Sequence, residues 1–159
     1  MTAPALCCRV DDMVDRPARA MADNDYGCAV VVDGDGRLLG ILTMRDVVRA
    51  AVATGKRLDK IRVGEAMTAA THGCTTESGL AQAESIMQRW HVRRLPVTGP
   101  DGRVVGVLSL DDLARTAARA KVSRAKIDVS LAGVGATLAT ICEPLLREDG
   151  PKATSRRAR

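Results

Sequence analysis

The feature that most constrains this chain is an internal repeat, in which a seven-residue stretch occurs twice, 66 residues apart. The two copies are GILTMRD at Gly40 to Asp46 and GVLSLDD at Gly106 to Asp112. At the same offset the match continues without a gap, and 14 of the first 51 positions are identical. Ordinary residue frequencies would give roughly three to five identities by chance. A repeat of this kind predicts one supersecondary unit used twice, with the apolar faces of the copies packed together.

The composition of the 159 residues indicates one globular domain with an aliphatic core. The chain is long enough to bury such a core, but Phe is absent, and Tyr26 and Trp90 are each the single residue of their type. No apolar run approaches the length of a membrane span, and the first residues lack the basic and then apolar plan of a signal peptide. We therefore expect a cytoplasmic protein without membrane contact.

The net charge of +5 comes largely from the last eight residues, which include four basic side chains. A short basic segment of this kind is more often a solvated, disordered tail than a nucleic-acid-binding arm. The rest of the chain has no basic patch interleaved with aromatic residues, so nucleic acid is not an expected partner. A protein- or nucleic-acid-binding adaptor acting through this basic C-terminal tail is the alternative function.

Five cysteines are present, and none of them forms a Cys-x-x-Cys pair. In a reducing cytoplasm we expect free thiols that behave as small buried hydrophobic side chains. Cys8 and Cys74 occupy equivalent positions of the two repeats, which keeps a redox or metal role open as the alternative.

The pattern of the first repeat predicts the order strand, helix, strand, strand, helix. The helix from about 15 to 24 carries Pro17 in its first turn and Asp15 as its cap. Two strands follow, over 28–33 and 37–43, joined by a tight Gly-Asp-Gly turn. A second helix spans about 44–53, and Gly55 stands where glycine ends helices. Residues 57–64 read as a largely polar connection.

The second repeat predicts the same order, with an extended segment at 74–76, a helix over about 77–90, strands around 95–97 and 104–109, and a helix over about 110–120. Pro96 predicts an edge strand or an irregular position, because proline cannot donate a ladder hydrogen bond. After Lys121 we expect the repeat to end. A short added helix should follow Ser130, closed by Pro144 and docked on the body or on a second subunit, and disorder is expected from Glu148.

The repeated motif places a hydroxyl and a carboxylate at the start of a helix. Thr43 stands where the strand ends, and the unpaired N–H groups of the following helix favour phosphate. Asp46, in the first turn, can accept hydrogen bonds from ribose hydroxyls. The same residues also fit a capping box without any ligand. The recurrence of the motif in Ser109 and Asp112 favours the ligand interpretation and leaves the capping box open.

These residues resemble a CBS domain pair, or Bateman module. The resemblance rests on the Gly-apolar-apolar-Thr/Ser-x-x-Asp motif after Asp-Gly-Arg, twice, together with Arg93-Arg94-Leu95-Pro96-Val97 and Val63 to Thr68, and it covers about residues 1–120. It implies an α+β fold of two β-α-β-β-α repeats packed about a pseudo-twofold axis. It also implies two clefts that hold AMP, ADP, ATP or S-adenosylmethionine.

By the same resemblance, Asp46 and Asp112 would bind ribose, Thr43 and Ser109 would bind ribose or phosphate, and the strand starts near Cys7, Tyr26, His72 and Val92 would line the adenine slot. Tyr26, Gly27 and Cys28 of the first repeat differ from Val92, Arg93 and Arg94 of the second, so the two clefts cannot be equivalent. The candidate nucleotide-binding residues are Thr43, Arg45, Asp46, Ser109, Asp112, Tyr26, Cys28, His72, Arg93 and Arg94.

We therefore expect a stand-alone, non-enzymatic regulatory module that binds an adenosine nucleotide and signals by conformational change, with no cofactor and no metal site. His72 and His91 stand in no spacing that ligates metal or forms a catalytic dyad. Homodimerisation is expected, and the regulated partner protein is not encoded in the chain. The predicted boundaries are a first repeat at 1–62, a second at 63–122, a helical extension at 123–147 and a basic tail at 148–159.

The two clefts are also expected to prefer different ligands. Arg45 of the first motif stands where a guanidinium could bind a phosphate, whereas Asp111 puts a second carboxylate beside Asp112. The Thr43 and Asp46 cleft should therefore take di- or triphosphates, and the Ser109 and Asp112 cleft a less charged adenosine ligand or none. Arg93 or Arg94 would offset Asp111 by pointing into that cleft, which strand alternation allows for only one of them. The alternative is that Arg45 and Asp111 both face solvent and that the two clefts behave alike.

Overall fold

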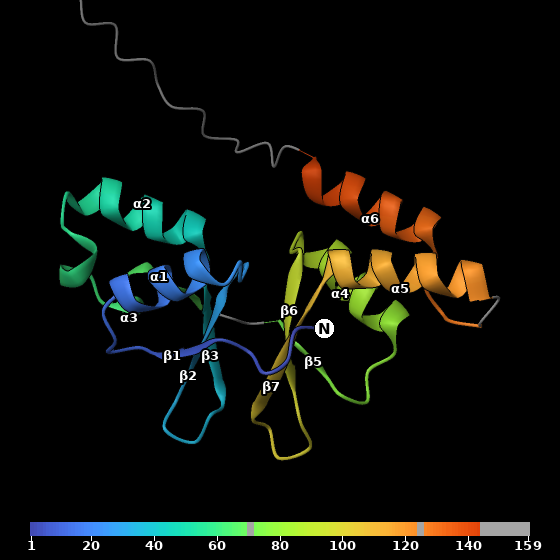
Figure 1. Ribbon diagram of the computed structural model, residues 1–159, viewed down its shortest axis with the longest axis horizontal. Helices are drawn as coiled ribbons and strands as arrows, with labels where there is room; N and C mark the ends of the chain where they lie inside the picture. The colour runs from blue at the N-terminus through green and yellow to red at the C-terminus, as the bar shows by residue number, and fades with distance from the viewer. Residues whose placement is uncertain (70–71, 124–125, 144–159) are drawn as a thin grey trace, which may run out of the picture.

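The computed structural model describes residues 1–69, 72–123 and 126–143, which form two halves that each hold a β-sheet with helices against it (Figure 1). The strands are β1 (Cys7–Arg9), β2 (Ala29–Val32), β3 (Leu38–Leu42), β4 (Thr68–Ala69), β5 (Cys74–Thr75), β6 (Arg94–Thr98) and β7 (Val104–Ser109). The helices are α1 (Asp15–Asp23), α2 (Met44–Thr54), the 3-10 helix η1 (Leu58–Lys60), α3 (Val63–Ala66), α4 (Leu80–Trp90), α5 (Leu110–Ser123) and α6 (Leu131–Cys142). The predicted α+β class is confirmed.

The two sheets share one topology, as the repeat requires. In the first, β1 runs parallel to β2 and β2 antiparallel to β3; in the second, β5, β6 and β7 are arranged in the same way. The ladders shift register at the same place, between Val31 and Val32 and between Val97 and Thr98. Arg37 forms a bridge with Arg103, its own equivalent. A pair of equivalent residues that meet in this way marks the pseudo-twofold axis between the repeats.

Each repeat also gives its Met-Thr-Ala segment to the sheet of the other repeat. Strand β4 opens the second repeat but pairs with Gly40 and Ile41 of β3. In return, the N–H of Thr2 donates to the carbonyl of Val107 at 2.9 Å, and the N–H of Val107 donates to that of Thr2 at 3.0 Å. A Cβ on Gly40 would lie 2.8 Å from the Thr68 carbonyl oxygen. Glycine is therefore required at this position by close backbone approach.

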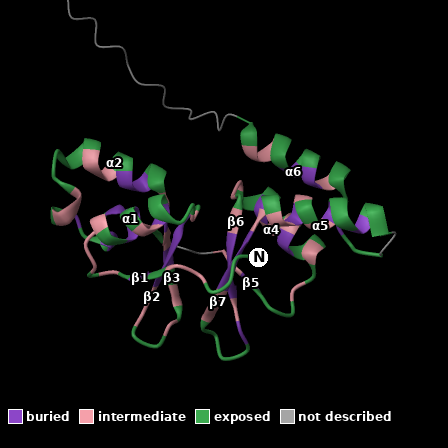
Figure 2. Cartoon of the chain, viewed as in Figure 1, coloured by how far each residue is buried: buried purple, intermediate pink, exposed green. Residues whose placement is uncertain are grey.

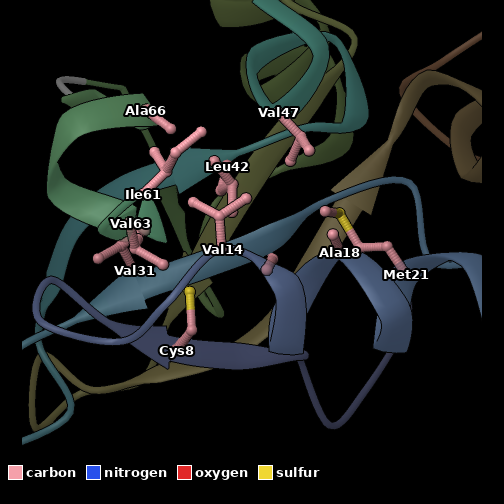
Figure 3. Packing of buried hydrophobic residues seen from close by; sticks show 11 residues of the cluster. Cys8, Val14, Ala18, Met21, Val31, Leu42, Val47, Ile61, Val63 and Ala66 are labelled. Carbon is pink, nitrogen blue, oxygen red and sulfur yellow. The ribbon is translucent and has the colours of Figure 1, made fainter. Parts of the chain in front are cut away.

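The core is aliphatic, as predicted, and is divided into one cluster per repeat. In the first, Cys8, Met21 and Leu42 are buried, and in the second their equivalents Cys74, Met87 and Leu108 are buried. Figure 2 shows buried segments on the strands of both sheets and on parts of the helices. Figure 3 shows the first cluster, whose side chains fill the space between the sheet and the helices. A third, smaller cluster joins the halves and includes Cys28, Val30 and Val107.

The start of α1 differs from the prediction. Asp15 is the first helical residue rather than the cap, and the cap position belongs to Val14, which makes no side-chain cap. Val14 is fully buried, and its N–H donates to the carbonyl of Ile61 at 2.9 Å, so packing fixes this helix end. Pro17 lies in the first turn, and α2 ends at Gly55 with φ 65°, as predicted.

The connection between the repeats is more structured than its polar composition indicated. It contains η1 and α3, and Ile61 and Val63 are fully buried in the first cluster. A short match to this connection follows the predicted end of the second repeat, since Lys126, Ile127 and Val129 stand 66 residues after Lys60, Ile61 and Val63. Val129 is buried in the second cluster, as Val63 is in the first. Ile127, however, is 38% exposed whereas Ile61 is fully buried, so the segment before α6 packs only in part as the connection does.

Of the two positions predicted for Pro96, the edge strand is wrong, because β6 is the middle strand of its sheet. The irregular position fits, since the ladder with β7 shifts register between Val97 and Thr98. Pro96 pairs with Val107 on the β7 side, whereas the pairing with β5 covers only Val97 and Thr98. The missing proline N–H is tolerated because β5 starts too late to need it at this position.

Helix α6 docks on the body of its own chain. Ser130 caps it by accepting a hydrogen bond from the Gly133 N–H at 3.1 Å, as predicted. The Thr137 hydroxyl donates to Glu84 of α4 at 3.0 Å, and Asp128 accepts from the N–H of Ala81 at 3.1 Å, at the start of α4. Pro144 and the predicted tail lie outside the described residues.

The strand exchange predicts opposite effects for one chemical change at two glycines. We expect Gly40→Ala to lower the free energy of unfolding by about 1–3 kcal/mol, because the added methyl group must displace Thr68 or Met67. Gly135→Ala should raise it by about 0.5–1 kcal/mol, since nothing lies within 4 Å and alanine is the better helix former. Urea unfolding of both variants measures the difference. Equal effects would contradict the close approach.

Candidate functional site

The first repeated motif forms a closed hydrogen-bond network at the start of α2. The Thr43 N–H and hydroxyl both donate to Oδ2 of Asp46, at 3.0 and 2.6 Å, and the Asp46 N–H donates back to the hydroxyl at 3.3 Å. Arg49 donates to Oδ1 at 2.8 Å. The capping box that the sequence left open is therefore present.

The second motif repeats this network at the start of α5. The Ser109 N–H and hydroxyl donate to Oδ2 of Asp112 at 2.9 and 2.6 Å, and the Asp112 N–H donates to the hydroxyl at 3.1 Å. Arg115 donates to Oδ1 at 2.7 Å. The hydrogen bonds of the two networks match because the motifs match, but the second network has one addition. The N-terminal ammonium group of Met1 lies 3.5 Å from Oδ1 of Asp112.

The environment of Asp112 favours its ionised form. Burial alone would raise the pKa of this carboxyl, but the hydrogen bonds from the Ser109 side chain and backbone and from Arg115 outweigh burial and lower the pKa to about 2. Asp112 therefore carries a full negative charge at neutral pH and can only accept hydrogen bonds. Such a group suits a neutral donor such as a pair of hydroxyls.

A cleft of about 190 Å³ lies between the two repeats next to the second motif. We call it the Tyr26–Ser109 cleft, after one residue from each repeat. The first repeat lines it with Thr2, Ala5, Leu6, Asp25, Tyr26, Gly27 and Cys28, and the second with Arg94, Val107, Ser109, Asp111 and Arg115. Four of the predicted residues are thus brought together: Tyr26, Cys28, Arg94 and Ser109.

Asp111 was also expected at this cleft, whereas Thr2, Ala5, Leu6, Asp25, Val107 and Arg115 were not predicted to line it. Thr2, Ala5 and Leu6 reach the second motif only because the N-terminal segment pairs with β7. The signal for this exchange was the duplicated Met-Thr-Ala segment, but its spacing alone does not reveal which sheet it joins. The presence of Asp111 and Arg115 in the cleft follows from their places in the sequence. Asp111 stands close to Ser109, and Arg115 lies one turn later on α5.

Arg93 and Arg94 diverge, as strand alternation requires. Arg94 lines the Tyr26–Ser109 cleft, whereas the Arg93 guanidinium donates to Sγ of Cys142 at the end of α6, at 2.9 Å. Arg94 is the equivalent of Cys28 at the 66-residue offset, so these two residues of the cleft come from the same place in each repeat.

The other predicted residues lie apart from this cleft. Arg45 lines an open hollow of about 590 Å³ on the outer face of α2, together with Val48 and Val52. The His72 ring stacks on Trp90, with centroids 3.7 Å apart and planes at 14°. Thr43 and Asp46 lie at the start of α2, where they are the equivalents of Ser109 and Asp112. The equivalent of Ala5 on that side would be residue 71, which lies outside the described ranges.

All five cysteines are free, and Cys8, Cys28 and Cys74 are buried. Burial raises the pKa of the Cys8 thiol to about 12, with smaller effects from Asp12 and Cys7. Across the described part of the chain, no three His, Cys, Asp or Glu side chains gather in a way that could hold a metal ion. Buried thiols of this kind remain protonated and pack as hydrophobic side chains.

None of the helices within residues 1–69, 72–123 and 126–143 combines the length and the apolar character that crossing a membrane requires.

The family model of the CBS domain matches residues 1–53 and 63–119. A 17.7 kDa protein of Acidianus ambivalens is 35% identical over 98 residues, which are 62% of this chain and 58% of that protein. The chain therefore spans less than two thirds of that relative. Hypoxic response protein 1 of Mycobacterium tuberculosis is 28% identical over 115 residues, covering 72% of this chain and 80% of that protein.

Two solved structures show the same fold. The crystal structure of Hypoxic Response Protein I, which contains two coordinated zinc ions, has a TM-score of 0.65 at 28% identity and covers 72% of this chain and 92% of that one. The structure of CBSX2 in complex with AMP has a TM-score of 0.66 at 21% identity and covers 76% of this chain and 95% of that one.

The hydrogen bonds around Asp112 predict an acid-dependent loss of stability. Because its pKa is lower in the folded chain than in the unfolded chain, the ionised carboxylate stabilises the fold above about pH 4. This contribution should disappear as the pH falls from about 4 towards 2. NMR titration of the Asp112 carboxyl should give a midpoint of about 2. The midpoint should rise in Arg115→Gln, and an ordinary value in the wild-type chain would contradict the network.

Proposed function

Because this chain belongs to the CBS domain family and packs two copies of the domain as a pair, we propose that it is a regulatory module that binds an adenine nucleotide between its repeats. The observation that carries the proposal is the Tyr26–Ser109 cleft, which both repeats line. Modules of this family are generally regulatory rather than catalytic, and the family model that matches this chain is that of the CBS domain. We propose no enzymatic activity for it.

The cleft offers a distinct chemical group to each part of a nucleoside. Tyr26, Leu6 and Val107 supply aromatic and apolar surface for a base, which stacks on such side chains. Ser109 supplies a hydroxyl, and Asp112 beside it is a carboxylate that accepts hydrogen bonds, as ribose hydroxyls require. The AMP bound by CBSX2, which shares the fold, supports an adenine nucleotide as the ligand. S-adenosylmethionine, which carries the same adenosine group, is a second candidate.

A ligand in this cleft would act on the arrangement of the repeats. The cleft is lined from both sides, so a bound nucleotide contacts β7 and α5 of one repeat and the segment before β2 of the other. Its binding therefore favours one relative placement of the two halves over others. A partner protein that contacts both halves would respond to that change. The five free thiols fit a reducing compartment such as the cytoplasm.

We also propose that the chain forms a homodimer through the outer faces of α2 and α6. On α2, Met44, Val48 and Val52 are 40%, 56% and 80% exposed. In the second repeat Leu110, the equivalent of Met44, is buried in the cluster that includes Val134 of α6. A helix of the same chain thus covers in one repeat the face that is uncovered in the other, so a helix is the occupant that this face fits.

Charge favours α6 of a second copy as that occupant. Residues 131–142 contain no charged side chain, and Leu131 and Leu138 are exposed on the outer face. Contact between two α2 helices would instead bring together Arg45 and Arg49 of both copies. Helices α2 and α6 lie on the same side of the molecule (Figure 1), so a twofold axis can pair each α2 with the partner's α6.

The ligand proposal predicts stabilisation by adenine nucleotides. In a thermal-shift panel of adenosine, AMP, ADP, ATP, S-adenosylmethionine and GMP, at least one adenine compound should raise the melting temperature, because a ligand at 100 times its Kd adds about 2.7 kcal/mol. GMP should have a smaller effect. Deletion of residues 149–159 should leave the shifts unchanged. No shift with any adenine compound would contradict the proposal, and a shift lost with the tail would favour the adaptor alternative.

Substitution of the two motif carboxylates should weaken nucleotide binding. Asp112→Asn should weaken nucleotide affinity in the Tyr26–Ser109 cleft by about 1.5–3 kcal/mol, since it removes a charged acceptor for ribose, and Asp46→Asn should do the same for a ligand held at the first motif. Asparagine at this third helical position keeps an oxygen that can accept a hydrogen bond from the capping Thr43 or Ser109, so helix content measured by circular dichroism should be retained. Asp59→Asn, which changes an exposed carboxylate, is the matched control for calorimetry. Unchanged affinity in the double variant would contradict a ribose role.

The dimer proposal predicts a specific dissociation. Light scattering at micromolar concentration should give the mass of two chains, and Val48→Glu or Leu138→Glu should each give the mass of one, because a buried, unpaired carboxylate is costly. Val122→Glu changes another exposed valine, on α5, and should remain dimeric. A monomeric wild-type chain would contradict the proposal.

A further inference from the structure

Helix α6 has no counterpart in the first repeat. It packs against α4 and α5 of the second repeat (Figure 1). The residues that stand 66 positions before it, 65–76, belong instead to the end of α3 and to the segments around β4 and β5. Because the first repeat completes its sheet and helices without such a helix, a second role for α6 is compatible with the fold.

Few contacts hold α6 on the body of the chain. Val134 and Thr137 are its two buried residues. The Thr137 hydroxyl donates to Glu84 of α4 at 3.0 Å, and the Gln88 side chain donates to the hydroxyl of Thr140 at 3.5 Å. A helix of 12 residues that contains two glycines is not stable alone in water. The helical state of α6 therefore depends on its docking, and such an element opens locally at a low cost in free energy.

Arg93 connects the C-terminal end of α6 to the wall of the Tyr26–Ser109 cleft. Its guanidinium donates to Sγ of Cys142, the last residue of α6, at 2.9 Å. Its carbonyl accepts a hydrogen bond from the N–H of Leu110, the first residue of α5, at 2.9 Å. The next residue, Arg94, lines the cleft and pairs with Ser109 in the ladder between β6 and β7. One residue thus contacts the end of α6 and both segments that form the second repeat's side of the cleft.

A second, apolar connection leads from the motif to α6. Leu110 follows Ser109 directly, is 5% exposed and belongs to the cluster that contains Val134 of α6. Its equivalent Met44, at the start of α2, is 40% exposed. Docked α6 therefore completes the burial of the residue that follows the hydroxyl of the second motif.

We infer, on the basis of the nucleotide-binding function proposed above, that α6 is the element through which the module reports its ligand. A ligand in the Tyr26–Ser109 cleft contacts the start of β6 and the start of α5, and it restrains the placement of both. That placement directs the Arg93 guanidinium to Cys142 and holds Leu110 in the cluster that α6 completes. Binding therefore favours the docked state of α6, and by linkage the docked state raises the affinity for the ligand by the same factor.

Hydrogen exchange of the α6 amides with and without AMP tests this inference. Saturating AMP should slow exchange across 131–142 by about 2- to 10-fold, which corresponds to one hydrogen bond. Cys142→Ala removes the acceptor of Arg93 without changing any charge, and it should abolish most of this slowing. Glu143→Gln, a change at the adjacent exposed residue, is the matched control and should behave as the wild-type chain. S-adenosylmethionine replaces AMP if AMP does not bind.

Calorimetry measures the reciprocal effect. Val134→Glu places a carboxylate in the buried cluster and should undock α6, so its AMP affinity should fall by the factor that hydrogen exchange gives. Melting temperatures without ligand show whether each variant is folded. All samples are compared at one chain concentration, because α6 is also part of the proposed dimer contact.

The outcomes separate the coupling from the binding itself. Ligand binding that leaves the exchange of α6 unchanged, an undiminished slowing in Cys142→Ala, or an unchanged affinity in folded Val134→Glu would overturn the coupling and leave nucleotide binding intact. If the folded wild-type chain binds neither AMP nor S-adenosylmethionine, the function proposed above is wrong, and the coupling is wrong with it.

Discussion

The structure depends on a close approach between backbones that only glycine permits. Strand β4 lies against Gly40 and the segment at Thr2 against Gly106, with carbonyl oxygens 2.8 and 2.9 Å from the positions that side chains would need. These contacts hold each repeat in the sheet of the other. Neither repeat is therefore complete by itself, and a cleft between them is lined by both. The cleft between the repeats exists because each repeat adds a segment to the sheet of the other.

Much of the fold could be predicted from periodicity and turn residues. The helices after Thr43 and Ser109, the turns at Gly36 and Gly102 and the helix after Ser130 depend on local chemistry that a sequence displays. The predictions failed where residues that are distant in sequence determine the local structure. Helix α1 starts after Val14 because the carbonyl of Ile61 accepts the Val14 N–H, and Pro96 is tolerated in a middle strand because β5 is short. Neither condition is visible in the residues around these positions.

The same division applies to the candidate site. The motif residues and their capping geometry follow from a four-residue pattern, and the pattern predicted which side chains would meet. The composition of the cleft does not follow from it, because Thr2, Leu6 and Tyr26 reach Ser109 only through the pairing of strands far apart in sequence. Strand alternation predicted that only one of the two adjacent arginines points into the cleft. It could not predict that the Arg94 side chain occupies the space over Gly27, because that contact forms only when the two repeats pack together.

The meeting of Cys28 and Arg94 has a consequence for how such a pair can diverge. Two separate copies of a single repeat, associated about a true twofold axis, must carry the same residue twice at any position next to that axis. An arginine there would face a second arginine, and the repulsion would weaken the assembly. Joining the copies in one chain removes this constraint, since each position is then encoded separately. One substitution next to the axis can thus give one cleft a charge that its twin lacks, and two sensors of different ligands can arise from one ancestral unit.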